Sequence, residues 1–441
     1  MFRLLAALPF FFLSCLHGAP LTLQDCFQLS LKENPKTVSS RMKVKEAKEE
    51  ALIEKAAYYP ELKASAHGFK WQTHNFLELS TIPPGIPPNI LPSVIGPTED
   101  YGYLVSAKYT LYDFGEAKER YLAARSKKGA AEFDRIRLQE EILLNVAIAF
   151  YQLASYDALV GVAQKNLERT EHHLKLVQQK RDVGTAPKSD LLRAQVDVAE
   201  AKLNLVRMES QFEIARARLR EAIGLDSDIA LTIQAERSSR SQPEEDDLLW
   251  ARKTAYAARP EIKSLCFQIS GRTHQLKAVQ STHWPKVTAL GTYGKRDSDF
   301  LPEEDEWLFG VRMEMPLFTG FRITHEEGKA KANIREAEAN LASTRLKIEE
   351  EVHTAYSKLK EAFEVIETTS VQVKDAEEGM RLTEERYEAG ASTLTDLLDA
   401  KTQLLRAEAN HANAEWNFEA AIFYFQWTQG ILSDNLCRTH S

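Results

Sequence analysis

Apolar residues recur every seven positions along most of the chain, which is the spacing of a coiled-coil seam. The clearest row of large side chains comprises Val146, Leu153, Val160, Leu167 and Leu174. The same pattern returns from Val352 to Met380. It predicts long helices at Glu116–Asp182 and Lys188–Ile223, and a further helical stretch at Leu21–Tyr58. The heptads alone also fit a simple antiparallel coiled-coil hairpin.

Four shorter segments alternate apolar and polar residues with a period of two, as strands do when their two faces differ. They are Leu62–Trp71, Tyr101–Leu111, Val287–Arg296 and Trp307–Leu317. Each is close to the ~9–11 residues that a tilted strand needs to cross a bilayer. Four strands cannot close a barrel, and an open edge in lipid leaves backbone groups unpaired. Either the strands lie in water as two hairpins, or several chains pool them.

The chain contains an internal repeat, so that its two halves share one sequence pattern. Gly184 and Gly224 recur at a constant offset as Gly390 and Gly430, and Asp190 recurs at the same offset as Asp396. Each half is expected to run helix, strand, loop, strand, long helix, turn, helix, and the first half has an extra proline-rich loop at Ile82–Pro97. The predicted domains are a signal peptide (1–19), a first repeat (20–225), a segment between the repeats (226–260), a second repeat (261–432) and a C-terminal tail (433–441).

The N-terminus is typical of an exported protein. Arg3 precedes the apolar stretch Leu4–Leu16, which is too short to span a bilayer and predicts a signal peptide. A second interpretation is a lipoprotein signal with acylation at Cys15, although the bulky Phe12 and Leu13 fit that pattern poorly. After the signal, no run of the ~18 consecutive apolar residues needed for a membrane helix is expected.

Composition and motifs exclude several classes of function. The 441 residues carry a net charge of −8 and are 44% hydrophobic, which excludes a disordered chain and a cationic surface for nucleic acid. The four cysteines form no C-x-x-C pair, and His172-His173 lacks further ligands, so no zinc site is expected. There is no phosphate-binding glycine loop, H-E-x-x-H motif or nucleophile elbow. We predict no enzymatic activity, no cofactor and no bound metal.

Two motifs give the layout a family resemblance. They are Arg386-Tyr387 followed by Gly390 and by Asp396-Leu-Leu-Asp399, and the strand-to-helix junction Leu111-Tyr-Asp-Phe-Gly115. The chain resembles the TolC-type outer-membrane efflux proteins over nearly its whole mature length. The resemblance implies a mainly α fold with a small membrane β part, in which a homotrimer forms a 12-stranded β-barrel continuous with an α-helical barrel across the periplasm. It also implies an equatorial belt, here at Ser227–Pro260.

The resemblance also implies a function and partners. The channel-tunnel is a passive exit route through outer-membrane lipid and the periplasm, for an inner-membrane efflux pump or a type I secretion system. A periplasmic adaptor docks on the helical tips. The matching turns comprise Val183, Gly184, Thr185 and Ala186, and Ala389, Gly390, Ala391 and Ser392. On the residues alone, both turns also serve simply to reverse the chain, because glycine supplies the backbone freedom for it.

The resemblance assigns further residues to the periplasmic entrance. Asp396 and Asp399 match two aspartates that threefold repetition turns into acidic rings, which attract cations. Their place in the first turn of a helix equally predicts a favourable interaction with the helix dipole. Asp190 and Tyr387 match members of the network that closes the entrance. The family's arginine in that network is replaced here by Ser392, and Arg386 or Arg193 are the candidates to substitute for it.

A different class of function remains open on the sequence. A soluble periplasmic coiled-coil or adaptor-like protein would also have heptads and long helices. Such a protein has no need for Trp307, Phe309, Val311 and Met313 on one strand face, so the strands discriminate between the two hypotheses.

Overall fold

The structure, a computed structural model, describes residues 20–74, 94–226, 231–237 and 242–433. The predicted signal peptide with Cys15, most of the loop Ile82–Pro97 and nearly all of the C-terminal tail lie outside the described residues. The chain divides into two compact units. The first comprises residues 1–44, 131–264 and 340–441, and the second comprises 45–130 and 265–339. Each unit therefore combines segments from both halves of the sequence.

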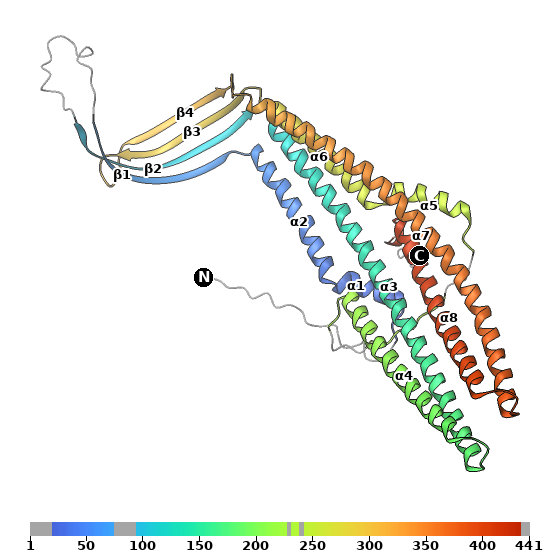
Figure 1. Cartoon of the computed structure of the whole chain (residues 1–441). Coiled ribbons are helices and arrows are strands. Elements are labelled where there is room, and N and C mark those ends of the chain that lie inside the picture. The colour runs from blue at the N-terminus through green and yellow to red at the C-terminus, as the bar shows by residue number, and fades with distance from the viewer. Residues whose placement is uncertain (1–19, 75–93, 227–230, 238–241, 434–441) are drawn as a thin grey trace, which may run out of the picture. The chain divides into compact units, whose positions relative to one another are not determined.

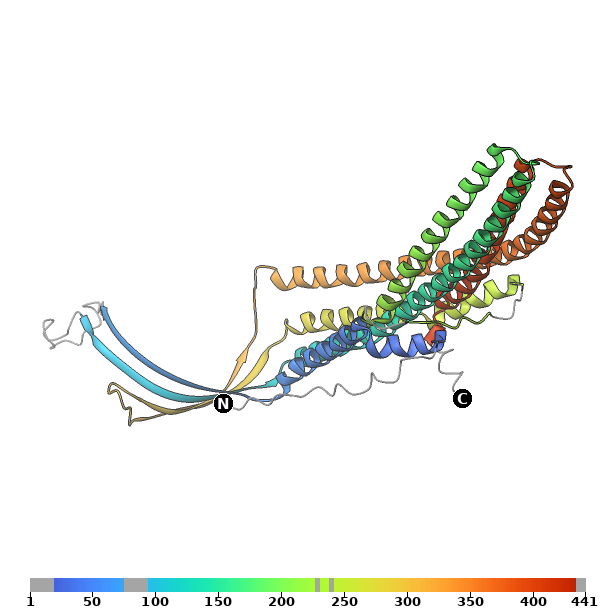
Figure 2. The same cartoon turned by 90° about the horizontal axis from the view of Figure 1, so that it is seen from below.

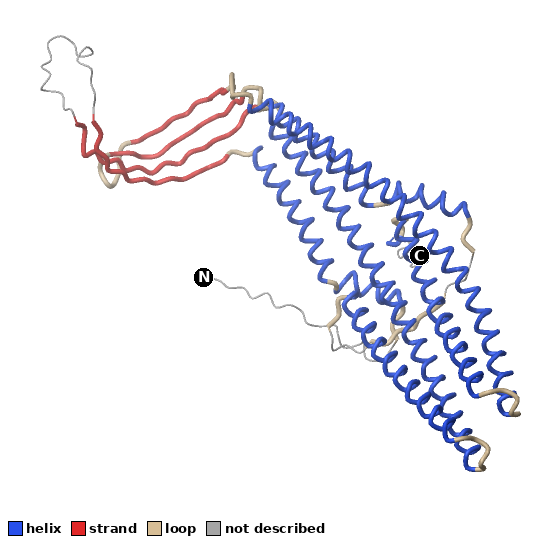
Figure 3. The backbone as a smooth tube through the Cα atoms, in the orientation of Figure 1, coloured by secondary structure: helices blue, strands red, loops and turns tan. Residues whose placement is uncertain are grey.

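Two helical hairpins dominate the first unit. The long helices α3 (Glu116–Asp182) and α7 (Arg322–Glu388) have 67 residues each. Each is followed by a shorter helix, α4 (Lys188–Ile223) or α8 (Leu394–Thr428), and Figure 3 shows the short loop that joins each pair. The two helices predicted from the first row of heptads are confirmed at both ends.

The predicted helical stretch at the start of the chain is interrupted. α1 spans Leu23–Glu33, α2 spans Pro35–Lys55, and a 3-10 turn follows at Ala56–Tyr58. Pro35 has no N–H to donate, and it holds the preceding Asn34 in an extended conformation, with φ −64° and ψ 123°. In the second repeat, α5 (Glu245–Ala258) and α6 (Pro260–Ser281) are separated in the same way by Arg259.

A glycine packs against each of these breaks. Gly224, with φ +89°, ends α4, and a Cβ placed there would lie 2.7 Å from the Cα of Asn34. The Asn34 side chain donates a hydrogen bond of 2.9 Å from Nδ2 to the carbonyl of Ala222. Gly430, with φ +70°, approaches Arg259 in the same manner, and a Cβ placed there would lie 3.1 Å from the Cα of Arg259. The repeat seen in the sequence is thus a repeat of backbone contacts, which require glycine for space and for its positive φ.

The largest apolar cluster of the first unit lies along the middle of α3. It includes Phe27, Leu143, Phe150, Leu153 and Leu219, from α1, α3 and α4. By length and mean hydropathy this middle part also makes α3 the one described helix that could cross a membrane, although, as expected, it contains no run of ~18 consecutive apolar residues. Half of that stretch is buried inside the chain, so its composition is that of a core helix.

The second unit contains one antiparallel sheet with the order β1-β2-β3-β4 (Figure 1). The strands are β1 (Glu61–His74), β2 (Val94–Tyr112), β3 (Lys286–Asp297) and β4 (Asp305–Glu314). All four predicted strands are present. β2 begins inside the segment expected to be a loop, and β4 ends before Leu317 because Pro316 cannot donate to the ladder.

The sheet is a single curved layer, and no described helix of this unit covers either face (Figure 2). Large apolar side chains nevertheless project from one face and are at least half exposed. They are Tyr103 (50%), Val105 (54%), Trp307 (67%), Phe309 (70%) and Val311 (67%). β1 and β4 each pair with a described strand on one side only. The sheet therefore has an uncovered apolar face and two open edges.

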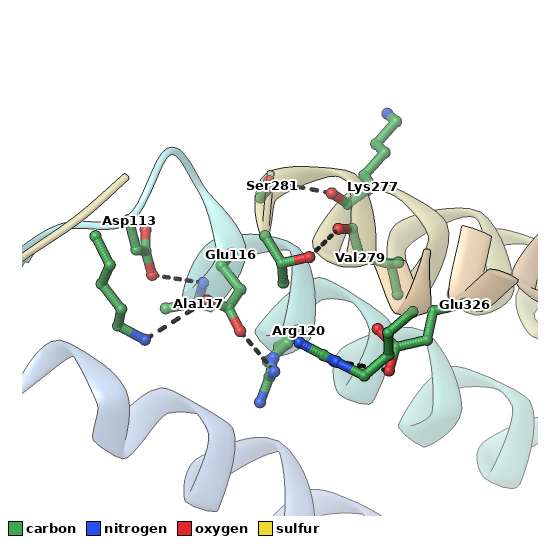
Figure 4. A network of polar contacts seen from close by, with 11 residues as sticks. Asp113, Glu116, Ala117, Arg120, Lys277, Val279, Ser281 and Glu326 are labelled. Atoms are coloured by element: carbon green, nitrogen blue, oxygen red, sulfur yellow. Dashed lines mark hydrogen bonds and ion pairs between the residues drawn. The ribbon is translucent and has the colours of Figure 1, made fainter. Parts of the chain in front are cut away.

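The junction between β2 and α3 is built by a capping aspartate (Figure 4). Asp113 accepts hydrogen bonds from the backbone N–H of Gly115 (3.0 Å) and of Ala117 (2.8 Å). Ser281 at the end of α6 donates to the carbonyl of Phe114 at 3.1 Å. Phe114 has φ +53°, and Phe321 in the second repeat has φ +62°. Both strand-to-helix turns thus place an aromatic residue in the left-handed region that favours glycine.

Candidate functional site at the helical tips

The first tip is a tight chain reversal that ends α3. Gly184, with φ +79°, donates its N–H to the carbonyl of Arg181 at 2.8 Å, and the N–H of Thr185 bonds to the carbonyl of Lys180, also at 2.8 Å. These bonds satisfy carbonyls that the end of the helix leaves without partners. Val183 at this tip is 75% exposed, so it presents an apolar side chain to solvent.

The second tip repeats this geometry and adds a capping box. Gly390, with φ +76°, donates its N–H to the carbonyl of Tyr387 at 3.1 Å, and the N–H of Ala391 donates to the carbonyl of Arg386 at 2.8 Å. α8 then begins at Leu394, with Thr393 as its N-cap residue. The Thr393 hydroxyl accepts from the N–H of Asp396 at 3.2 Å, and the Asp396 carboxylate accepts from the N–H of Thr393 at 2.9 Å.

The two candidate ring aspartates have different surroundings. Asp396 accepts hydrogen bonds from the Thr393 backbone, from the Thr393 hydroxyl (2.7 Å) and from the Ser392 hydroxyl (3.1 Å), and these donors lower the pKa of its carboxyl. The helix-capping interpretation of Asp396 therefore holds in the single chain. Asp399 is exposed one turn further along α8. A role in a ring stays a prediction for both residues, since it needs more than one copy.

Tyr387 lies between the two hairpins. Its ring centroid is 5.7 Å from that of His173 and 4.6 Å from Nζ of Lys180, and both of these residues are on α3. Burial raises the pKa of the Tyr387 hydroxyl, and the negative charge of Asp190 adds to the shift. The charge of Asp190 thus acts on the Tyr387 hydroxyl within one chain, while the ring contacts of Tyr387 are with His173 and Lys180 of α3.

The two arginines considered as substitutes for the missing family arginine are not placed in this contact. The side chains of Arg386 and Arg193 are exposed, and neither forms an ion pair with any residue that the structure describes. Ser392 itself contributes to the cap of α8 through Asp396. The part these arginines play in closing an entrance stays a prediction.

A buried polar cluster above the tips was not found from the sequence. Lys401 of α8 is 8% exposed, and its Nζ lies 3.6 Å from Oδ2 of Asp197 on α4. His173 is 3% exposed, and its Nε2 has no hydrogen-bond partner among the described residues. Burial and the charges of Lys401 and Lys180 lower the pKa of His173 to about 4, so the imidazole is neutral. The one sign of this cluster in the sequence is Lys401, a charged residue that lies four positions after Leu397, a member of the apolar row of α8.

Comparison with known proteins identifies the family. A sequence model of the outer membrane efflux protein family matches residues 26–225 and 251–421, which cover most of the chain. The chain belongs to the outer membrane efflux protein family. It is an outer-membrane protein of TolC type that extends into the periplasm, and its family is one of channels.

Individual relatives are distant but cover most of the chain. Protein CyaE of Bordetella pertussis is 23% identical over 89% of this chain and 80% of its own length. The pyoverdine export outer membrane protein OpmQ of Pseudomonas aeruginosa is also 23% identical, over 89% of this chain and 81% of its own. The Campylobacter jejuni CmeC outer membrane channel is 18% identical, superposes with a TM-score of 0.78, and covers 94% of this chain and 88% of its own. This last likeness shows the TolC-type fold.

Proposed function

We propose that three copies of this outer membrane efflux protein close a 12-stranded β-barrel and a continuous α-helical barrel. The assembly is a passive exit route across periplasm and outer membrane for an inner-membrane efflux pump or a type I secretion system. The observation that carries the proposal is the four-stranded sheet with an uncovered apolar face and two open edges. Such a sheet is stable in a bilayer only when further strands pair with both edges, because lipid offers the backbone no hydrogen bonds.

The helical unit supports assembly independently. α4 buries one face, which includes Leu191, Val198 and Leu219, against its own chain. A second apolar row on the same helix stays at least 42% exposed and comprises Leu192, Val196, Leu203, Val206 and Ile214. A long apolar stripe on a water-exposed helix favours association. A neighbouring copy packed on this stripe would continue the helical layer around a cylinder.

The helical tips supply the candidate entrance and docking sites. Asp396 and Asp399, repeated three times, form two acidic rings that favour cations over anions. We assign Tyr387 and Asp190 to the network that closes this entrance, and Tyr387 also contacts His173 and Lys180 of the other hairpin. The turns at Val183–Ala186 and Ala389–Ser392 are largely exposed and present backbone and small side chains, to which we assign the docking of a periplasmic adaptor.

A pair of matched lysine substitutions tests the membrane part. Val311→Lys places a charge on the apolar face of β4, and such a charge costs about 2–4 kcal/mol at the bilayer midplane. Thr292→Lys on β3 places the same charge on the opposite, polar face. We expect Val311→Lys to reduce recovery from the outer-membrane fraction and heat-modifiable migration in detergent, and Thr292→Lys to leave both near wild type. Wild-type protein recovered as a soluble monomer would contradict the proposal.

A further inference from the structure

A ladder of ionisable side chains crosses all four strands of the sheet. On the polar face, Asp100 of β2 accepts two hydrogen bonds of 2.8 Å from the guanidinium of Arg296 on β3. His67 of β1 places Nε2 3.6 Å from Asp100, and Glu306 of β4 places Oε1 3.6 Å from Arg296. Each strand thus contributes one residue, and Asp100 is 8% exposed.

The backbone leaves space for this ladder. Gly102 of β2 pairs with His67 on one side and with Arg296 on the other. A Cβ at Gly102 would lie 2.6 Å from Cε1 of His67. Any side chain there would displace the imidazole that now lies over this glycine and reaches Asp100. The ladder therefore depends on the strand register, which places a residue without a side chain between two long ones.

The ladder ends at the two open edges with complementary groups. β1 carries His67 and β4 carries Glu306, and both edge strands pair with described strands on one side only. Oε2 of Glu306 is shielded from solvent and accepts no hydrogen bond from a described residue. The Nε2 atom of His67 faces Asp100, so the other ring nitrogen, Nδ1, is available for a second partner.

We propose that the ladder continues from chain to chain, with Glu306 of one copy facing His67 of the next across the seam between β4 and β1. Three copies then form a closed ring of alternating acidic and basic groups on the polar face, which is the lumen of the barrel. Among the registers that keep the polar face toward the lumen, the ring selects one, because a shift by two residues would move Glu306 about 7 Å along the seam from His67. This inference rests on the proposed trimer and adds the register and the residues of its seam.

Site-specific cross-linking tests the seam. In the full-length protein with Cys266 and Cys437 replaced by serine, we would combine His67→Cys with Glu306→Cys and treat membranes with a short thiol-specific cross-linker. The matched control combines Lys63→Cys with Glu306→Cys. Lys63 lies on the same face of β1, about 13 Å from His67 at ~3.3 Å per residue. We expect covalent trimers from the first pair and, under the same conditions, at least tenfold less from the control.

The outcomes separate the ladder from the trimer. Each double-cysteine variant is first sized in detergent without cross-linker. A trimer that cross-links more efficiently through Lys63→Cys, or through neither pair, overturns the ladder and leaves the trimer intact. A protein of one-chain mass for every variant and for the wild type overturns the proposed function, and the ladder with it.

Discussion

Removal of one partner from the buried ion pair between α4 and α8 is the most informative perturbation of the helical unit. Lys401 is nearly completely buried, and Asp197 lies 3.6 Å away with its side chain 30% exposed. Neither Nζ of Lys401 nor Oδ2 of Asp197 has a hydrogen-bond partner among the described residues. Burial lowers the pKa of Lys401, and Asp197 opposes that shift. Asp197 is therefore the principal compensation for a buried ammonium group.

The expected change in the free energy of unfolding depends on whether a substitution leaves a buried charge without a partner. Asp197→Ala leaves the buried Lys401 charge without a partner, and breaking a buried pair in this way typically costs about 3–5 kcal/mol. The partial exposure of Asp197 places the expected loss near the lower end, at about 3 kcal/mol. Lys401→Met removes the charge and keeps most of the volume, so it is expected to be neutral or stabilising.

An exposed pair between α3 and α4, the two helices of the first hairpin, provides the control. Glu171 of α3 and Lys202 of α4 are 3.3 Å apart, but their side chains are 51% and 59% exposed. Glu171→Ala should therefore cost about 0–1 kcal/mol. Hydrogen exchange of backbone amides in α4 and α8 measures the local free energy of opening. We expect exchange to accelerate by more than about 100-fold in Asp197→Ala, since about 1.4 kcal/mol is tenfold.

The double substitution completes this test. With Lys401→Met in place, Asp197→Ala should have little further effect, because no charge remains to be stranded. Equal acceleration in Asp197→Ala and Glu171→Ala would refute the reasoning, as would a loss in the double variant as large as in Asp197→Ala alone.

Three further predictions concern pH, charge and backbone. His173 has a folded pKa of about 4, below its usual 6.5, so the stability that neutral His173 contributes is present above pH 6.5 and is lost as pH falls. By pH 5 the loss is about 2 kcal/mol, which should appear as faster hydrogen exchange of backbone amides near the tips. His173→Leu should abolish this pH dependence. Asp396→Asn with Asp399→Asn should lower cation preference and block by multivalent cations in bilayer recordings, and unchanged values would argue against acidic rings. Gly224→Ala should cost about 1–3 kcal/mol through its positive φ and the contact with Asn34, whereas an unchanged melting temperature would contradict that contact.

The long helices could be predicted from sequence because their heptads are local. The bounds of α3 and α4 follow from the apolar rows and from the glycines at 184 and 224. The break at Asn34 was also visible, since Asn34-Pro35 recurs as Arg259-Pro260, yet the stretch was predicted as one helical region. Proline interrupts it because it cannot donate a backbone hydrogen bond and restricts the residue before it.

The tips were accessible from sequence, whereas the charge clusters were not. Gly390, Thr393 and Asp396 lie within a few residues of each other, so a turn and a cap can be read directly. Lys401 and Asp197, or His67 and Glu306, come from distant segments. Their proximity depends on helix packing and on strand register, which one sequence does not specify.

The measurement that bears most directly on the central claim is the native mass of the protein extracted from the outer membrane in detergent, combined with its conductance in a planar bilayer. The account predicts particles of three chains, each giving a single large pore. A particle of one chain with no conductance would contradict it, since one copy supplies a four-stranded sheet with both edges open.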